Sequence, residues 1–147
     1  MATLSSTLKA SKEAIYALLT DYPSYPDWAV DVAEAAVLDQ ENDIVVVEFN
    51  SPELLAEKYV LELVHSAADS ILYQQVDQFE GYGLRGSWQL ADASEGTLLT
   101  CEMHLKLDFW ASFHARRKVE LILRRRVEAL GRKLTDSPTT QWFAFPP

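Results

Sequence analysis

The longest regular pattern in this 147-residue chain is SFHARRKVELILRRRVEALGRKL, residues Ser112–Leu134. The segment contains no proline, and its single glycine, Gly131, lies near its end. With about 100° between successive residues of a helix, one stripe collects Ala115, Val119, Ile122, Leu123, Val127, Leu130 and Leu134. The pattern predicts an amphipathic helix of ~35 Å, at about 1.5 Å per residue. A stripe of that length needs a broad apolar partner.

The preceding part of the chain supplies this partner as strands. Apolar and polar residues alternate most clearly in Thr97–Phe109, as expected of a strand with one buried face. Six further segments have strand patterns: Thr3–Ala10, Val32–Leu38, Ile44–Phe49, Glu57–His65, Ile71–Val76 and Gly81–Leu90. Short connections between strands favour antiparallel pairing.

Two short helices are expected after the first strand. Ser11 can cap a helix that ends near Asp21, and a second helix can start near Tyr25–Pro26, because proline is tolerated in a first turn. The sequence thus predicts an α+β fold in which a curved antiparallel sheet of about seven strands wraps around the long C-terminal helix. One domain covers residues 1–134.

The segment 135–147, TDSPTTQWFAFPP, differs in composition and is expected to be a separate C-terminal tail. Its prolines rule out a continued helix. Trp142, Phe143 and Phe145 are apolar enough that we expect them to pack on the domain or on a partner chain. A homodimer formed through this tail is one such arrangement.

The formal charge of −9 is unevenly distributed. Segment 112–134 has eight basic and two acidic residues, so it carries +6 and leaves −15 on the rest. An acidic body argues against DNA binding, which needs a broad basic surface. The basic face of the helix could meet an anionic membrane surface, RNA or an acidic protein, or it could be a solvated face that balances an acidic sheet.

Several site classes have no signature here. Cys101 is the single cysteine, and the three histidines show no metal-binding spacing, so we expect neither a metal nor another cofactor. GYGLRG, Gly81–Gly86, matches a dinucleotide motif in letters but lacks its strand-to-helix setting. The N-terminus shows no leader pattern and no apolar run is long enough to cross a membrane, so a cytoplasmic location is expected.

Three segments resemble the START-like, Bet v 1-like (SRPBCC) superfamily and its polyketide cyclase/dehydrase and coenzyme Q-binding branch. They are AIYALLTDYPSYPDW (Ala14–Trp28), GLRGSWQL (Gly83–Leu90) with GTLLTCEMHLKLDF (Gly96–Phe109), and the terminal helix. The resemblance implies a helix-grip fold with a hydrophobic cavity between the sheet and the long helix. It also implies binding of lipids, quinones, polyketides or similar apolar molecules.

Pockets of this type are mostly apolar with a few polar anchors. From strand and helix periodicity we expect the lining to include Tyr59, Leu61, Leu63, His65, Tyr73, Leu84, Trp88, Met103, Leu105, Phe113, Leu123, Arg126 and Val127. Alternatively, each of these side chains only packs in the core and does not contact a ligand.

Arg126 stands out because it falls inside the apolar stripe of the helix. It is interpreted either as a cation that anchors an acidic ligand, or as a residue that reaches the rim or pairs with an acid. His65 is the histidine best placed for the pocket. With Tyr73, Tyr82 or Arg85 it could carry out acid–base chemistry; otherwise it is a satisfied core or rim histidine.

Three functions remain open from the sequence. The first is binding or transport of a hydrophobic small molecule, the second is a cyclase, aromatase or dehydratase reaction in the same cavity, and the third is interaction with a protein or the ribosome. The strands carry no dense polar constellation, which favours a non-enzymatic binding protein and leaves any catalytic residues unassigned.

Overall fold

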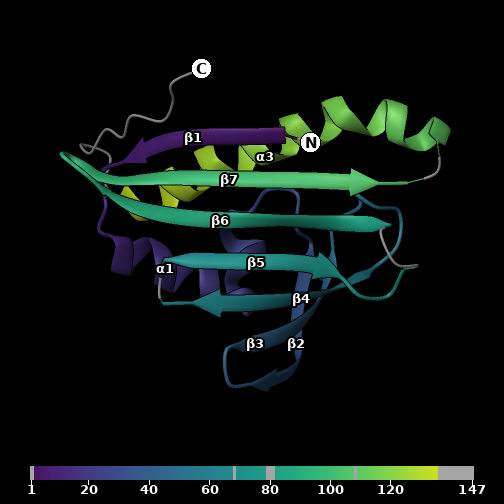
Figure 1. Cartoon of the computed structure of the whole chain (residues 1–147), viewed down its shortest axis with the longest axis horizontal. Coiled ribbons are helices and arrows are strands. Elements are labelled where there is room, and N and C mark those ends of the chain that lie inside the picture. Colours follow the sequence, from purple (N-terminus) through teal and green to yellow (C-terminus); the bar gives the residue numbers. More distant parts are fainter. Residues whose placement is uncertain (1, 68, 79–81, 108, 136–147) are drawn as a thin grey trace.

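The computed structural model of the chain describes residues 2–67, 69–78, 82–107 and 109–135, the last range without the side chains of 109–114. From residue 136 onward, the expected tail lies outside this range. Within the described residues, an antiparallel sheet forms one layer and the helices form another (Figure 1). The predicted α+β helix-grip architecture is confirmed.

The elements follow the predicted order. They are β1 (Ala2–Leu8), α1 (Lys12–Thr20), the 3-10 helix η1 (Tyr22–Ser24), α2 (Tyr25–Trp28), β2 (Glu34–Glu41), β3 (Ile44–Asn50), β4 (Tyr59–Ser66), β5 (Ser70–Gln75), β6 (Gly83–Ala93), β7 (Gly96–Lys106) and α3 (Phe109–Thr135).

The two short helices form where the sequence places them. The side chain of Ser11 accepts a hydrogen bond from the backbone N–H of Ala14 at 3.1 Å and so caps α1. Pro23 lies in the first turn of η1 and Pro26 in that of α2, where proline costs no helical hydrogen bond. Trp28, at the end of α2, is buried in the core.

The strand order in the sheet is β1-β7-β6-β5-β4-β3-β2. Strands β2 to β7 form a continuous meander, and β1 closes the series by pairing antiparallel with β7. The first and last strands are therefore neighbours, while β1 and β2 form the two edges (Figure 1).

Several element boundaries differ from the sequence expectation by a few residues, and two of them have a clear physical reason. Strand β7 ends at Lys106 and α3 already begins at Phe109, because the alternating pattern continues through residues that belong to the connection and the first turn. Strand β2 extends to Glu41, three residues beyond its expected end at Leu38. Nearly all of this edge strand is exposed, so burial imposes no alternation that could mark its end.

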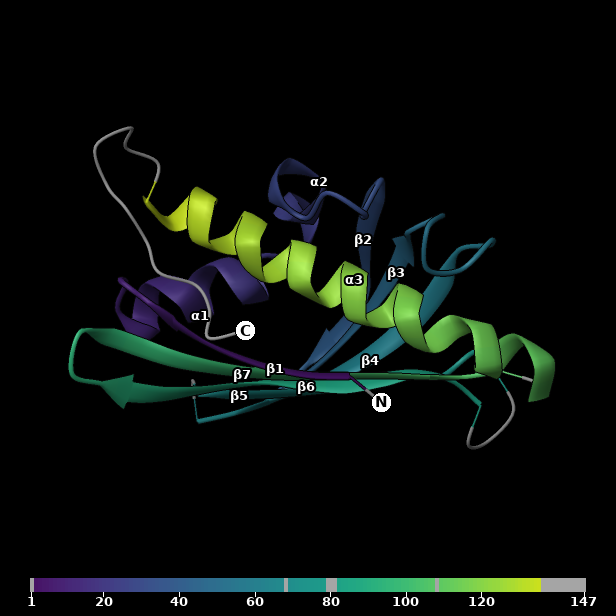
Figure 2. The ribbon, with the colours of Figure 1, turned by 90° about the horizontal axis from the view of Figure 1, so that it is seen from above.

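All helices lie on one face of the sheet, and α3 runs along that face against β7 and β1 (Figure 2). Alternate residues of each central strand point toward the helices and are buried, as Leu99, Cys101 and Met103 are in β7. The apolar stripe of α3 packs against β1 and β7. The core therefore lies between the inner face of the sheet and α3, and the outer face of the sheet is left uncovered.

Candidate functional site

Eleven of the thirteen residues expected to line the cavity are buried in the inner layer. Ten belong to the hydrophobic core, namely Tyr59, Leu61, Leu63, Tyr73, Leu84, Trp88, Met103, Leu105, Leu123 and Val127, and the eleventh is Arg126. The most exposed of the eleven, Leu105, reaches only 7%. The structure thus brings these residues together in one buried inner layer.

The remaining two residues are placed differently. Phe113 lies on α3, but its side chain is outside the described part of the structure. His65 lies near the end of β4 and is half-buried at the rim of the inner layer.

Arg126 forms an ion pair inside the core. Its Nε donates to Oδ1 of Asp31 at 2.9 Å, and its Nη2 donates to Oδ2 at 2.7 Å. The Ser51 hydroxyl donates to the same carboxylate at 2.6 Å. Asp31 lies between α2 and β2, and Ser51 follows β3, so three distant segments meet at one buried charge pair.

The electrostatics of this pair follow from its burial. Burial by itself raises the pKa of Asp31, but the Arg126 charge and the hydrogen bonds from Arg126 and Ser51 outweigh it and hold the pKa below 3.8. Asp31 is therefore ionised at neutral pH and compensates the buried guanidinium. This arrangement supports the ion-pair alternative for Arg126 over a free cation that awaits a ligand.

Tyrosine hydroxyls surround the pair. Burial raises the pKa of Tyr59, Tyr25 and Tyr73, while the Arg126 charge acts in the opposite direction on all three. Tyr25 donates to the Leu19 carbonyl at 2.6 Å and Tyr73 to the Glu102 carbonyl at 3.1 Å. These phenols remain protonated at neutral pH and act as neutral polar groups in an apolar interior.

The placement of Tyr73 depends on Gly86. The two residues are opposite each other in the β5–β6 pair, and the tyrosine ring extends across β6 to reach β7. A Cβ atom at residue 86 would overlap the Tyr73 hydroxyl and the Glu102 carbonyl. The absence of a side chain at Gly86 therefore provides the space that the ring occupies.

His65 pairs with Tyr22 of η1. The Tyr22 Oη and the His65 Nε2 lie 2.6 Å apart, and the ring of Tyr16 meets the imidazole edge-on at 6.0 Å. Burial lowers the pKa of His65 and raises that of Tyr22, which favours a neutral imidazole that accepts the phenol proton in a hydrogen bond. A buried tyrosine bonded to a half-buried histidine in this way can transfer protons.

The partners that the sequence offered for His65 lie elsewhere. Tyr73 bonds to β7, and Tyr82 is exposed below the Lys106 ammonium, 5.2 Å from its ring centroid. Arg85 points to the outer face of the sheet. Tyr22 lies just before the second expected helix and is not among the candidate residues predicted from the sequence. Asp31 and Ser51 gave no signal, because nothing in their local sequence indicates a buried partner.

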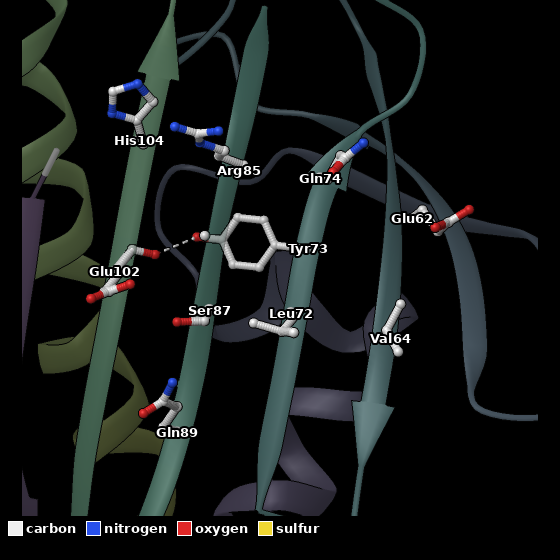
Figure 3. Close-up of a pocket in the computed structure, with 11 residues that line it drawn as sticks. Glu62, Val64, Leu72, Tyr73, Gln74, Arg85, Ser87, Gln89, Glu102 and His104 are labelled. Atoms are coloured by element: carbon white, nitrogen blue, oxygen red, sulfur yellow. Dashed lines mark hydrogen bonds between the residues drawn. The ribbon is translucent and has the colours of Figure 1, made fainter. Parts of the chain in front are cut away.

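The outer face of the sheet has a shallow pocket of about 440 Å³ (Figure 3). It is lined by Glu62, Val64, Leu72, Tyr73, Gln74, Arg85, Gly86, Ser87, Gln89, Glu102 and His104. Arg85 and His104 are cross-strand neighbours, and acidic and amide side chains lie around them. This pocket is on the face opposite α3, so it is distinct from the predicted cavity.

Within the described residues, no cluster of three or more His, Cys, Asp or Glu side chains could hold a metal ion. No helix in that part of the chain has the length and apolar character needed to span a membrane.

Comparison with known proteins agrees with this geometry. A family model described as polyketide cyclase/dehydrase and lipid transport matches residues 8–135. No curated protein sequence matches the chain significantly.

Solved structures with the same fold share little sequence with the chain. They include the di-domain aromatase/cyclase StfQ from the steffimycin biosynthetic pathway, with a TM-score of 0.76 and 14% identity over 92% of this chain and 50% of that one. A START superfamily protein from Mycobacterium smegmatis has a TM-score of 0.70 and 17% identity, covering 92% of this chain and 97% of that one. A STAR-related lipid transfer protein from Xanthomonas axonopodis has a TM-score of 0.73 and 18% identity, covering 89% of this chain and 83% of that one. The chain spans half the length of the di-domain protein.

Proposed function

The chain belongs to the polyketide cyclase/dehydrase and lipid transport family, and on that basis we propose that it binds or carries a hydrophobic small molecule between its sheet and α3. A lipid, a quinone or a polyketide-like compound fits this description. The observation that carries the proposal is the inner layer itself. It is apolar across β4 to β7 and α3, and its central charge pair is already neutralised.

The neutralised pair bears on the kind of ligand. An acidic ligand would have to displace Asp31 from Arg126 and leave a buried carboxylate without its partner, which costs several kcal/mol. A neutral molecule with one or two hydrogen-bonding groups can instead meet the protonated phenols of Tyr59 and Tyr73. We therefore expect an uncharged or weakly polar ligand.

A ligand needs an opening into this buried layer. We place this opening at the end of the sheet where Leu61 and Leu105 lie, which are 5% and 7% exposed. Leu61 is opposite Gln75, and Leu105 is opposite Leu84, so both lie near the connection between β5 and β6. An opening there needs no change in the central pairing of the sheet.

Native mass spectrometry of the purified protein tests this proposal, followed by titration of ligand-free protein with any apolar molecule found. Leu61→Trp should weaken binding at least tenfold, because the larger side chain occupies the opening. Leu72→Trp is the matched control, since Leu72 is 53% exposed on the outer face, and it should bind normally. Absence of a co-purified molecule, together with no affinity for lipids or quinones, would contradict the proposal.

A second candidate is a cyclase, aromatase or dehydratase reaction on the same class of molecule. The Tyr22–His65 pair favours it, because a neutral imidazole bonded to a phenol at a half-exposed rim can take up and return a proton. The two candidates differ in the fate of the ligand. A carrier returns it unchanged, whereas an enzyme converts it, and Tyr22→Phe or His65→Gln should then slow conversion without preventing binding.

A further inference from the structure

The solvent face of α3 carries a basic stripe centred on an exposed leucine. At about 100° per residue, Arg117, Lys118, Arg124, Arg125 and Arg132 lie within one sector around Leu121. Leu121 is 55% exposed, although it is a large apolar residue. From residue 117 to residue 132 the stripe is about 22 Å long, at 1.5 Å per residue.

Most of these cations have no internal partner. Arg125 pairs with Glu53, but Arg117, Lys118, Arg124 and Arg132 form no ion pair within the described residues. The single acid in the sector is Glu128. The Arg116–Glu120 pair lies beside the stripe, on the flank of the helix. The stripe therefore presents uncompensated positive charge, although the chain as a whole is strongly acidic.

The fold separates this charge from the acidic sheet. Figure 2 shows α3 on one side of the sheet. The cations of the stripe that lack a partner are all exposed to solvent. Several acids lie on the opposite surface, including Glu62 and Glu102 at the outer pocket. The unpaired cations of α3 thus lie on the side away from these acids, so an anionic surface would orient the protein with α3 inward.

We propose that the solvent face of α3 docks on the surface of an anionic lipid bilayer. A straight helix with a protruding leucine matches a flat surface, where cations meet lipid phosphates and carboxylates while Leu121 enters the apolar boundary. An acidic protein would have to supply a groove for the same helix. This inference concerns the outside of α3 and holds whether or not the interior binds a ligand.

Vesicle co-sedimentation of the full chain tests the proposal, using phosphatidylcholine alone and an equal mixture with phosphatidylserine. The protein should bind only the mixture, and added salt should weaken binding. Arg117→Gln with Arg124→Gln should lower the partition coefficient about thirtyfold, which corresponds to about 1 kcal/mol for each cation near an anionic surface. Lys12→Gln with Lys58→Gln is the matched control, because it removes the same charge elsewhere and should bind normally.

Two further variants separate docking from a general effect of charge. Glu128→Gln should increase binding to the mixed vesicles several-fold, because it removes the negative charge from the stripe. Leu121→Ser should lower binding roughly tenfold while leaving its salt dependence intact. Circular dichroism should show folded protein in each case, since the mutated stripe side chains are at least partly exposed.

Equal binding to both vesicle types would overturn the proposal, as would an equal loss in the lysine control. The protein could instead bind neither vesicle type but bind an acidic protein in a pull-down that depends on Arg117 and Arg124. The stripe is then a protein-binding surface and the membrane assignment is wrong.

Discussion

Single side chains show both what periodicity reveals and what it misses. Helical spacing placed Arg126 inside the apolar stripe, so its burial could be anticipated from the sequence. Its partner could not, because Asp31 lies 95 residues away in a segment between α2 and β2. Local sequence encodes which face a residue occupies. It does not encode which distant loop meets that face once the chain has folded.

The Asp31–Arg126 pair should respond strongly to mutation. Asp31→Ala should destabilise the fold by about 3–5 kcal/mol, because it leaves a buried guanidinium uncompensated. Glu53→Ala is the matched control, since it removes the carboxylate partner of the neighbouring Arg125 at a partly exposed site, and should cost less than about 1 kcal/mol. Urea unfolding measures both, and Asp31→Leu combined with Arg126→Met should recover most of the loss.

The same pair predicts a dependence on pH. The folded state lowers the pKa of Asp31 below 3.8, its value in an unconstrained carboxyl. Its stabilising contribution is therefore complete above about 3.8 and is lost as the pH falls through the folded pKa. In Asp31→Asn, the free energy of unfolding should lack the loss with falling pH that the Asp31 carboxylate causes. A variant with the same acid dependence as the parent protein would show that the carboxylate is not the group responsible.

The elements themselves follow closely from sequence patterns. Alternation identified the central strands because each has one face against the core, and the helical stripe identified α3 for the same reason. Pattern reading was weakest where burial is absent or ends gradually, as in the exposed edge strand β2 and the passage from β7 to α3. The patterns also placed most of the expected lining residues in one buried layer, but they could not show which polar side chains pair inside it.

The orientation of α3 can be tested with two leucines. Leu123 is 1% exposed and faces the sheet, so Leu123→Ala should cost about 2–5 kcal/mol through lost burial and an unfilled space. Leu121 is on the solvent side of the same helix, and Leu121→Ala should change stability by less than about 0.5 kcal/mol. Thermal unfolding of the two variants compares them directly. Similar losses at both positions would mean that α3 is rotated from the orientation described here.

The stability of the domain depends on the pairing of its first strand, β1, with its last strand, β7. Strand β1 covers the edge of β7, and its inward side chains Leu4 and Leu8 join the core. Deletion of residues 2–8 would expose that edge and remove buried apolar surface at the same time. The shortened protein should lose its cooperative unfolding transition and aggregate. A truncated chain that still unfolds in one sharp step would show that β2 to β7 with α3 suffice.

The β1–β7 pairing also sets the order of events during synthesis. Ser5 meets Thr100 across a separation of 95 residues, so the first strand leaves the ribosome long before its neighbour exists. Until then its backbone donors and acceptors are unpaired and open to a chaperone or to another nascent chain. Closing so distant a contact is slow compared with local hairpin formation. Pairing of β1 therefore waits until β7, 95 residues further along the chain, has been synthesised.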